Sequence, residues 1–225
     1  MCGRFTQRLS SADFARIFGA RDLLESAGER YNVAPSQRVA VVAEREEERV
    51  LEPMRWGLVP GWAKSPLAGK HPINARAETV AASPLFRHAF RATRCLVPAD
   101  GFYEWQRLPD GRRQPHYISA PNDQPLAFAG LWSAWSERTS EAPALLTCAI
   151  LTTTPNETMA TIHDRMPVIL TPEAWGLWLD RQSDPSELQG LLRPYSGDLR
   201  LYPVAPLVNS VRQQGPALIA PLLRE

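Results

Sequence analysis

Proline limits the regular secondary structure that this chain can form. There are 21 prolines in 225 residues, and they are spread along the sequence rather than gathered in one segment. Because proline lacks a backbone N–H and has a fixed φ, it interrupts helices and the interior of sheets. The sequence therefore favours short elements in an irregular α+β domain over a regular series of βαβ units.

The predicted elements are strands mixed with short helices. Apolar and alternating patterns predict strands over residues 39–43, 50–58, 95–97, 102–105, 116–118, 126–132 and 145–152. Capping residues and apolar spacing predict helices that begin near Ser10, Ser83, Asn156 and Thr171. Because neither an internal repeat nor a long linker divides the sequence, we expect a single domain over residues 1–225.

Charge and hydropathy exclude several classes of protein. A net charge of +1 argues against a polycationic nucleic-acid binder, although it is compatible with a local basic face. A hydrophobic content of 44%, with seven tryptophans, is sufficient for a packed core. No apolar run approaches the roughly 18 residues of a membrane span, and Arg4, Arg8 and Asp13 interrupt any signal-peptide pattern. We therefore expect a cytoplasmic protein without a membrane partner, associated with the nucleoid if it is bacterial.

The cysteines and histidines do not suggest a metal site. Three cysteines form no CxxC pair and leave an odd number, which is typical of a reducing compartment. Cys95 and Cys148 lie in apolar runs and are predicted to be buried thiols. His71, His88 and His116 are too scattered to nominate a metal site, and the sequence contains no phosphate-binding or dinucleotide motif. We expect neither a metal nor a cofactor.

Cys2 offers chemistry that no interior cysteine can perform. Removal of Met1, which a small second residue permits, would leave Cys2 with an α-amine beside its thiol. Such an amine has a reference pKa of about 7.7–8.0, so part of it is neutral at physiological pH and can attack an aldehyde. The thiol can then close a five-membered ring. In an arbitrary protein a cysteine at position 2 is more often incidental, so other residues must support this hypothesis.

Three further residues are candidates for acid–base or hydrogen-bonding roles. Glu104 lies between two aromatic residues on a predicted strand, where burial would raise its pKa, but strand alternation alone leaves a solvent-facing glutamate equally open. His163 has a reference pKa near ~6.5 that suits proton transfer, although an isolated histidine is more often structural. Asn74 could orient a substrate hydroxyl or simply occupy a turn.

Six motifs in a fixed order carry a family resemblance. They are Met1-Cys2-Gly3-Arg4-Phe5, Tyr31-Asn32-Val33-Ala34-Pro35, Met54-Arg55-Trp56-Gly57-Leu58-Val59-Pro60, Asn74-Ala75-Arg76-Ala77-Glu78-Thr79, Gly101-Phe102-Tyr103-Glu104-Trp105 and His163-Asp164-Arg165-Met166-Pro167. Together they resemble the SRAP (SOS response-associated peptidase) family, which includes proteins that crosslink to abasic sites in single-stranded DNA. A weaker match follows at Val208-Asn209-Ser210. The resemblance implies a compact α+β domain whose mixed, barrel-like β-sheet core is flanked by short helices, with a groove across one face.

The resemblance also implies a mechanism for the aminothiol. An abasic deoxyribose is mostly a closed hemiacetal, so its ring must open before an amine can attack the aldehyde. By similarity, His163 would protonate the ring oxygen, Glu104 would move protons during Schiff-base formation and cyclisation, and Asn74 would hold the sugar or the Cys2 amine. Cys2 would finish as a thiazolidine. The Schiff base could also undergo β-elimination, which implies a weak lyase side activity.

Single-stranded DNA requires cationic and stacking side chains. The arginines predicted to contact phosphates are Arg4, Arg76, Arg87, Arg91 and Arg165. The aromatic residues predicted to stack on bases are Trp56, Trp62 and Phe86. For each arginine the alternative is a salt-bridged or solvated surface, and for each aromatic residue it is the core. Without a base-reading signature we expect little sequence preference, and we expect a monomer.

Two alternatives from other functional classes remain open at this point. In a thiol hydrolase, His163 would deprotonate Cys2 and Asn74 would orient the imidazole, with acyl transfer through a thioester. Residues placed before Cys2 would leave that activity intact but would prevent thiazolidine formation. In a non-catalytic binder of single strands, Cys2→Ala would leave DNA retention unchanged. Only Met1 precedes Cys2, so methionine trimming would suffice and the sequence does not support self-proteolysis.

Overall fold

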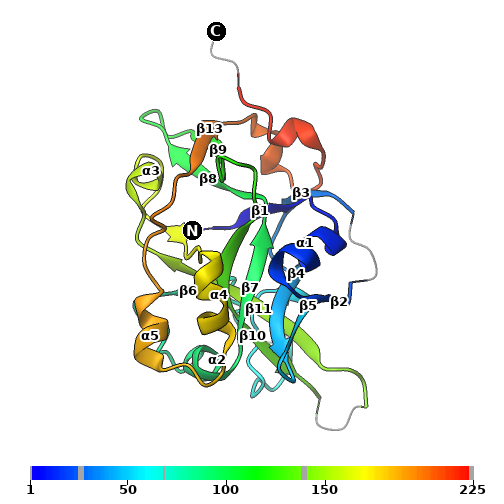
Figure 1. The fold of residues 1–225 in the computed structure, drawn as a ribbon. Coiled ribbons are helices and arrows are strands. Elements are labelled where there is room, and N and C mark those ends of the chain that lie inside the picture. The colour runs from blue at the N-terminus through cyan, green and yellow to red at the C-terminus, as the bar shows by residue number, and fades with distance from the viewer. Residues whose placement is uncertain (1, 25–27, 68, 138–140, 223–225) are drawn as a thin grey trace.

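The centre of the fold is a closed, barrel-like ring of strands (Figure 1). The computed structural model describes residues 2–24, 28–67, 69–137 and 141–222. In hydrogen-bonded order the ring strands are β11 (Leu145–Thr153), β10 (Leu126–Trp135), β7 (Arg94–Ala99), β4 (Arg38–Arg45) and β5 (Glu48–Trp56). A parallel pairing of β11 with β5 closes the ring, whereas its other pairings are antiparallel. The mixed, barrel-like core implied by the family resemblance is confirmed.

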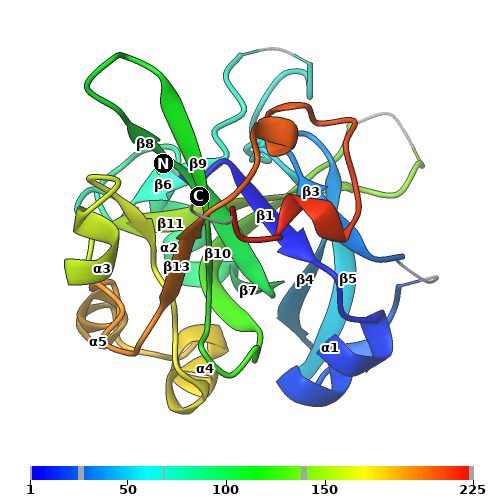
Figure 2. The ribbon, with the colours of Figure 1, turned by 90° about the horizontal axis from the view of Figure 1, so that it is seen from above.

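A second sheet, entirely antiparallel, lies at one end of the ring (Figure 2). Its strands, in order, are β13 (Arg200–Pro203), β9 (Arg113–Ser119), β8 (Gly101–Arg107), β1 (Arg4–Gln7) and β3 (Arg30–Val33). The chain passes from the ring into this sheet at Asp100, between β7 and β8. Short strands extend the ring sheet: β2 (Arg21–Asp22), β6 (Asn74–Arg76) and β12 (Met166–Pro167). Every strand predicted from the sequence overlaps one of the observed strands.

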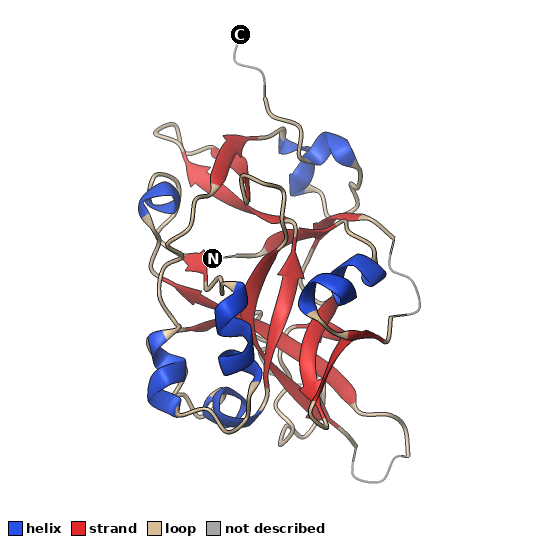
Figure 3. Cartoon of the chain, viewed as in Figure 1, coloured by secondary structure: helices blue, strands red, loops and turns tan. Residues whose placement is uncertain are grey.

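Short helices surround the strands (Figure 3). They are α1 (Ser11–Phe18), α2 (Arg87–Ala92), α3 (Glu157–Ala160), α4 (Pro172–Leu179), α5 (Pro185–Gly190) and the 3-10 helices η1 (Pro206–Asn209) and η2 (Pro216–Leu218). Ser10 caps α1 as predicted. Asn156 caps α3, which lies within the short helix predicted to begin at this residue. The predicted start of α2 at Ser83 was too early, because the N–H groups of Phe86 and Arg87 both donate to the Ser83 carbonyl in a preceding turn. Among the described residues, no helix is long and apolar enough to cross a membrane.

Aromatic side chains fill the inside of the ring and the gap between the ring and its helices. Inside, the Phe5 ring packs edge-on against Trp56, with centroids 5.0 Å apart. Outside, Phe18 of α1 stacks on Trp175 of α4 at 4.4 Å. Cys95 and Cys148 are fully buried in the inner cluster, as predicted. These contacts fix the ring as a rigid frame for the segments attached to it.

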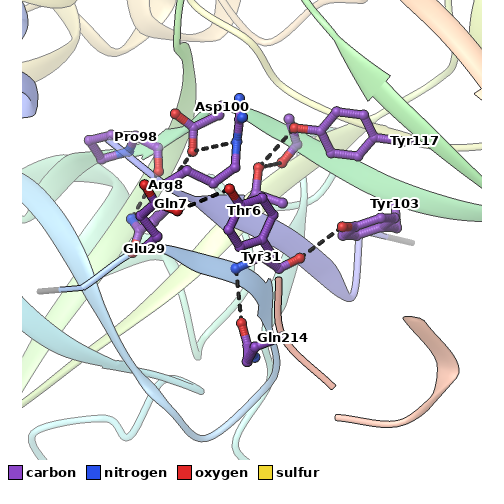
Figure 4. Close-up of polar contacts among 11 residues, drawn as sticks. Thr6, Gln7, Arg8, Glu29, Tyr31, Pro98, Asp100, Tyr103, Tyr117 and Gln214 are labelled. Carbon is purple, nitrogen blue, oxygen red and sulfur yellow. Dashed lines mark hydrogen bonds and ion pairs between the residues drawn. The ribbon is translucent and has the colours of Figure 1, made fainter. Parts of the chain in front are cut away.

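Strand β1 is attached to the ring by buried polar side chains (Figure 4). Gln7 Nε2 donates to the Ala40 and Pro98 carbonyls at 2.9 Å each, and Gln7 Oε1 accepts from the Ala40 N–H at 3.0 Å. The Asp100 carboxylate accepts from the backbone N–H of Arg8. Leaving such a buried group unpaired costs about 1–3 kcal/mol. The register of β1, and with it the position of the preceding Cys2, is therefore strongly specified.

Arg94 joins α2 and α4 to the ring. Its buried guanidinium donates to the carbonyls of Trp178 (2.6 Å), Phe90 (2.7 Å), Arg91 (2.6 Å) and Asp180 (2.5 Å). These carbonyls lie near the C-terminal ends of the two helices, where intrahelical partners run out. The guanidinium of Arg94 thus supplies hydrogen-bond donors to the unpaired carbonyls at the C-terminal ends of both helices.

We expect Arg94→Met to lower the free energy of unfolding by about 3–5 kcal/mol, because four helix-end carbonyls lose their donor and each unpaired buried group costs about 1–3 kcal/mol. Urea denaturation followed by circular dichroism measures this loss. Arg87→Met, which changes an exposed arginine on the same helix, should stay within about 0.5 kcal/mol of the wild type. Equal effects of the two substitutions would contradict the role assigned to Arg94.

Candidate active site

Four separate elements bring the predicted catalytic residues together. Cys2 lies two residues before β1, Asn74 begins β6, Glu104 lies on β8, and His163 follows α3. Asn74 Nδ2 donates to the Cys2 carbonyl at 3.0 Å, and His163 Nε2 lies 3.7 Å from Glu104 Oε2. The charge of Glu104 also acts on the Cys2 thiol. The four residues therefore form one cluster, although the sequence separates them by up to 161 positions (163 − 2).

Glu104 lies on the inner face of its strand. It shares that face with Phe102, whose ring packs edge-on against Phe128 in the barrel interior. Only 2% of Glu104 is exposed, so the structure resolves the two alternatives that the sequence left open. Burial raises the pKa of the carboxyl, and the nearby His163 offsets part of this effect. A raised pKa brings a carboxyl closer to the range in which it can both donate and accept a proton.

Two contacts orient the ring of His163. The N–H of Arg165 donates to Nδ1 at 3.0 Å, and Asp164 Oδ1 lies 3.1 Å from the same nitrogen. The other nitrogen, Nε2, faces Glu104 Oε2 at 3.7 Å. The imidazole therefore presents Nε2 toward the cluster, and its side chain is 23% exposed, which leaves it accessible to a ligand.

The environment of Cys2 keeps its thiol protonated. Cys2 is fully buried, and this burial, followed by the charge of Glu104, raises the pKa of the thiol well above its usual range. Reactive cysteines of thiol hydrolases have lowered pKa values instead. Beside Cys2, Asn74 Oδ1 is buried and has no hydrogen-bond partner among the described residues. Asn74 can therefore accept a hydrogen bond from an N–H or O–H group that enters the site.

Half of the predicted DNA-binding side chains are accessible. Arg76 is exposed two residues after Asn74, and Arg87 and Arg91 are both exposed on α2. Trp62 is 74% exposed. It borders an apolar hollow of about 490 Å³ between the 58–62 loop and α2, which none of the four clustered residues lines. These side chains place positive charge and an exposed indole ring outside the cluster.

Two predicted stacking residues are buried. Trp56 is fully buried because its strand closes the ring, and its indole Nε1 donates to the Ile73 carbonyl at 2.8 Å. Phe86 is 9% exposed and packs in the cluster between the ring and its helices. The prediction that Trp56 and Phe86 stack on bases was therefore wrong for this structure, since neither presents an open ring face.

The other two predicted phosphate ligands are engaged within the protein. Arg165 makes a bidentate pair with Glu78, with Nη–Oε distances of 2.5 and 3.0 Å. Arg4 Nη1 donates to Asn32 Oδ1 and to the Val208 carbonyl at 2.7 Å each. A phosphate would have to compete with these partners. Sequence reasoning gave Glu78 and Asn32 no role, although both lie inside the recognised motifs.

Across the described ranges, no group of three or more histidine, cysteine, aspartate or glutamate side chains could hold a metal ion. The four clustered residues contribute a thiol, a buried carboxyl, an imidazole and an amide. The barrel-like α+β fold and this cluster together define the class of protein to which the chain is compared.

The chain belongs to the SRAP family. The family model described as SOS response associated peptidase (SRAP) matches residues 1–211. The match includes every residue of the cluster and ends just after the Val208-Asn209-Ser210 motif. The resemblance inferred from six motifs is confirmed.

Two bacterial relatives and one bacterial crystal structure match nearly the whole chain. The abasic site processing protein YoqW of Bacillus subtilis is 45% identical over 224 residues, which cover 97% of this chain and 99% of that protein. The abasic site processing protein YedK of Escherichia coli is 35% identical, covering 99% and 100% of the two chains. A crystal structure of a Bacteroides thetaiotaomicron protein matches with a TM-score of 0.87 at 25% identity, covering 99% of this chain and 100% of that one.

Proposed function

We propose that this protein processes abasic sites in DNA. Membership of the SRAP family and the names of the relatives support this role. The observation that carries it is the convergence of Asn74, Glu104 and His163 on Cys2. Removal of Met1 would give Cys2 a free α-amine, and these three residues would then surround a 1,2-aminothiol. An abasic site is the DNA lesion that offers an aldehyde to such an amine.

The proposed product is a covalent thiazolidine. The Cys2 amine attacks C1′ of the ring-opened sugar to give a carbinolamine, which loses one water to become a Schiff base. The Cys2 sulfur then adds to the same carbon while the thiol proton passes to the nitrogen, which closes the ring. The net reaction joins protein and DNA with the loss of one water.

Each neighbour of Cys2 has a role in this sequence. In its imidazolium form, His163 donates the Nε2 proton to the sugar ring oxygen while the C1′–O4′ bond breaks and the C1′ hydroxyl gives its proton to solvent. Glu104 accepts a proton from the attacking amine and returns one to the departing hydroxyl, which a raised pKa allows. Asn74 holds the Cys2 backbone through Nδ2 and leaves Oδ1 for the amine or a sugar hydroxyl. If β-elimination overtakes ring closure, the same Schiff base leads to strand cleavage as a minor lyase activity.

The proposed substrate is single-stranded DNA, bound by a monomer in the cytoplasm or nucleoid. Exposed Arg76, Arg87 and Arg91 would contact phosphates, and Trp62 would stack on a base near the lesion. Arg4 and Arg165 would join them if DNA displaced their present partners. The reaction as written requires no metal or cofactor.

The thiol hydrolase is the weaker alternative. It needs a thiolate, whereas burial and Glu104 raise the pKa of the Cys2 thiol. In addition, the Nε2 of His163 faces Glu104 at 3.7 Å. An amine-first reaction proceeds from a neutral thiol and is therefore better matched to this environment.

Intact mass after incubation with abasic single-stranded DNA tests the proposal. We expect a heat-stable species with the mass of protein plus DNA minus one water. The matched control is the same oligonucleotide after borohydride reduction, which keeps the sugar but converts its aldehyde to an alcohol. The proposal fails if a protein confirmed to begin at Cys2 forms no adduct with the unreduced lesion, or forms equal amounts with both oligonucleotides.

A further inference from the structure

The 3-10 helix η1 is bonded to β1, the strand that follows Cys2. Arg4, two residues after Cys2 and the first residue of β1, donates from Nη1 to the Val208 carbonyl at 2.7 Å. Val208 is fully buried within η1. The beginning of β1 is therefore tied to a segment that lies more than 200 positions away in the sequence.

The same helix is bonded to the strand that carries Glu104. Trp105, the residue after Glu104 on β8, donates from its indole Nε1 to Asn209 Oδ1 at 2.8 Å. Asn209 is the last residue of η1 and is exposed. One short helix thus contacts the chain neighbours of both the nucleophile and the buried carboxyl.

The β1–β8 pairing places these contacts on one face. Arg4 pairs with Tyr103 across the two strands, and the Arg4 guanidinium lies 5.9 Å from the Trp105 ring. Because side chains alternate along a strand, Trp105 faces η1 while Glu104 faces the barrel interior and the Cys2 site. The hydrogen bonds from Arg4 and Trp105 to η1 therefore constrain the angle and spacing of β1 and β8. They do so from the face opposite Glu104, so they leave the Cys2 site open.

Asn32 anchors η1 from the neighbouring strand β3. Its fully buried side chain accepts from Arg4 Nη1 at 2.7 Å, and its Nδ2 lies within hydrogen-bond distance of the carbonyls of Ser210 (2.9 Å), Gln213 (3.2 Å) and Val208 (3.3 Å). A side chain with this many buried partners holds one geometry. Asn32 thereby fixes both η1 and the guanidinium that contacts it.

Gln214 extends this attachment along the edge of β3 (Figure 4). Its Oε1 accepts from the Tyr31 N–H at 2.9 Å, and its Nε2 donates to the Asn32 carbonyl at 3.2 Å. The side-chain amide therefore bonds to the backbone of two consecutive residues of β3. The segment after η1 is secured at the same sheet.

We propose that η1 acts as a clasp that sets the position of the Cys2 amine relative to Glu104. Asn209, acting through Trp105, and Asn32, acting through Arg4, are the positioning residues. This inference rests on the proposed function, because it names what aligns the same site. Reacting groups that are misplaced by even a small distance lose rate while substrate affinity is kept.

The test uses the exposed end of the clasp, because Asn32→Ala changes a buried residue and could prevent folding. Asn209→Ala is expected to slow single-turnover crosslinking at saturating DNA by about twofold to tenfold, the range for one lost hydrogen bond. The DNA dissociation constant should change by less than about twofold, because neither Asn209 nor its partner Trp105 is a proposed DNA ligand. Trp105→Phe should have the same effect, and the double variant should be no slower than either single variant.

Gln213→Ala is the matched control, because Gln213 is exposed and only its backbone carbonyl meets Asn32. It should crosslink at the wild-type rate. Additive effects of Asn209→Ala and Trp105→Phe, or a loss confined to DNA affinity, would overturn the positioning role.

A second readout separates this inference from the proposed function. The rate at which 2-cyanobenzothiazole labels the N-terminal aminothiol reports access to Cys2 without DNA. Asn209→Ala should raise this rate about twofold to tenfold by loosening the buried N-terminal segment, whereas Gln213→Ala should leave it unchanged. If wild-type protein forms no DNA adduct, the proposed function fails, but a faster labelling of Asn209→Ala still supports the clasp. Unchanged labelling of this variant overturns it.

Discussion

Cys2→Ala is expected to form no heat-stable adduct with abasic single-stranded DNA. The substitution leaves an α-amine but removes the sulfur that closes the ring, so only a reversible Schiff base can form. Because Cys2 is fully buried and alanine is smaller, we also expect a modest loss of stability, of about 1 kcal/mol. Denaturing electrophoresis and intact mass measure the adduct, and thermal unfolding establishes that the variant is folded.

Borohydride trapping shows which part of the reaction survives in this variant. If Cys2→Ala is trapped on abasic DNA by borohydride but gives no adduct without it, the amine attacks first and the sulfur makes the product permanent. An adduct that persists in Cys2→Ala without reduction would contradict the thiazolidine. Loss of native DNA binding together with the adduct would instead indicate a damaged binding surface.

An N-terminal extension distinguishes the α-amine from the thiol. A variant that retains two residues before Cys2 keeps the thiol but converts its amine into an amide, which cannot attack an aldehyde. We expect this variant to form no thiazolidine while it still binds single-stranded DNA. A thiol hydrolase would retain its activity after the same change.

The architecture could be predicted largely from local patterns. Capping at Ser10 and Asn156 and the apolar runs of the ring strands carry their own physical signals, and these elements lie where they were expected. The closure of the ring was implied only by family resemblance, because a parallel contact between β5 and β11 joins residues about 90 positions apart and leaves no local trace. The closure of the ring also buries Trp56. Considered only as part of its sequence motif, Trp56 had been predicted to stack on a base.

The site was predictable in its residues but not in its orientation. Strand alternation at Glu104 allowed either face, and only the packing of Phe102 against Phe128 shows which face is inner. Charge alone could not show that Arg165 is paired with Glu78, because their separation of 87 positions is set by the fold. Sequence patterns specify which chemistry is available, whereas long-range packing decides which group meets which.

Glu104→Gln is expected to slow crosslinking by about 10²–10⁴-fold, the usual contribution of a positioned acid or base. Glutamine preserves the size of the side chain and its hydrogen-bonding atoms but cannot exchange a proton. The whole effect should appear in the first-order rate constant for crosslinking, measured at saturating DNA. Glu47→Gln, which makes the same chemical change in the exposed β4–β5 turn, should react at the wild-type rate.

The same substitution should have an unusual effect on stability. Burial raises the pKa of Glu104 in the folded protein, so folding favours the protonated carboxyl. The resulting stability is fully present below the unfolded pKa, about 4.3, and is lost as the pH rises through the raised folded value. Glutamine does not ionise and does not lose this stability. As the pH rises from the unfolded to the folded pKa of Glu104, the free energy of unfolding of Glu104→Gln should therefore increase relative to that of the wild type.

At neutral pH, Glu104→Gln should therefore be at least as stable as the wild type while being far slower. Urea denaturation at several pH values, paired with single-turnover rates, tests both halves of this expectation. A variant that loses stability and rate together at neutral pH would show that the carboxylate mainly supports the fold. Retained stability with lost rate would mean that the protein keeps an ionisable group in an unfavourable environment for its proton chemistry, as is expected of a catalytic carboxyl.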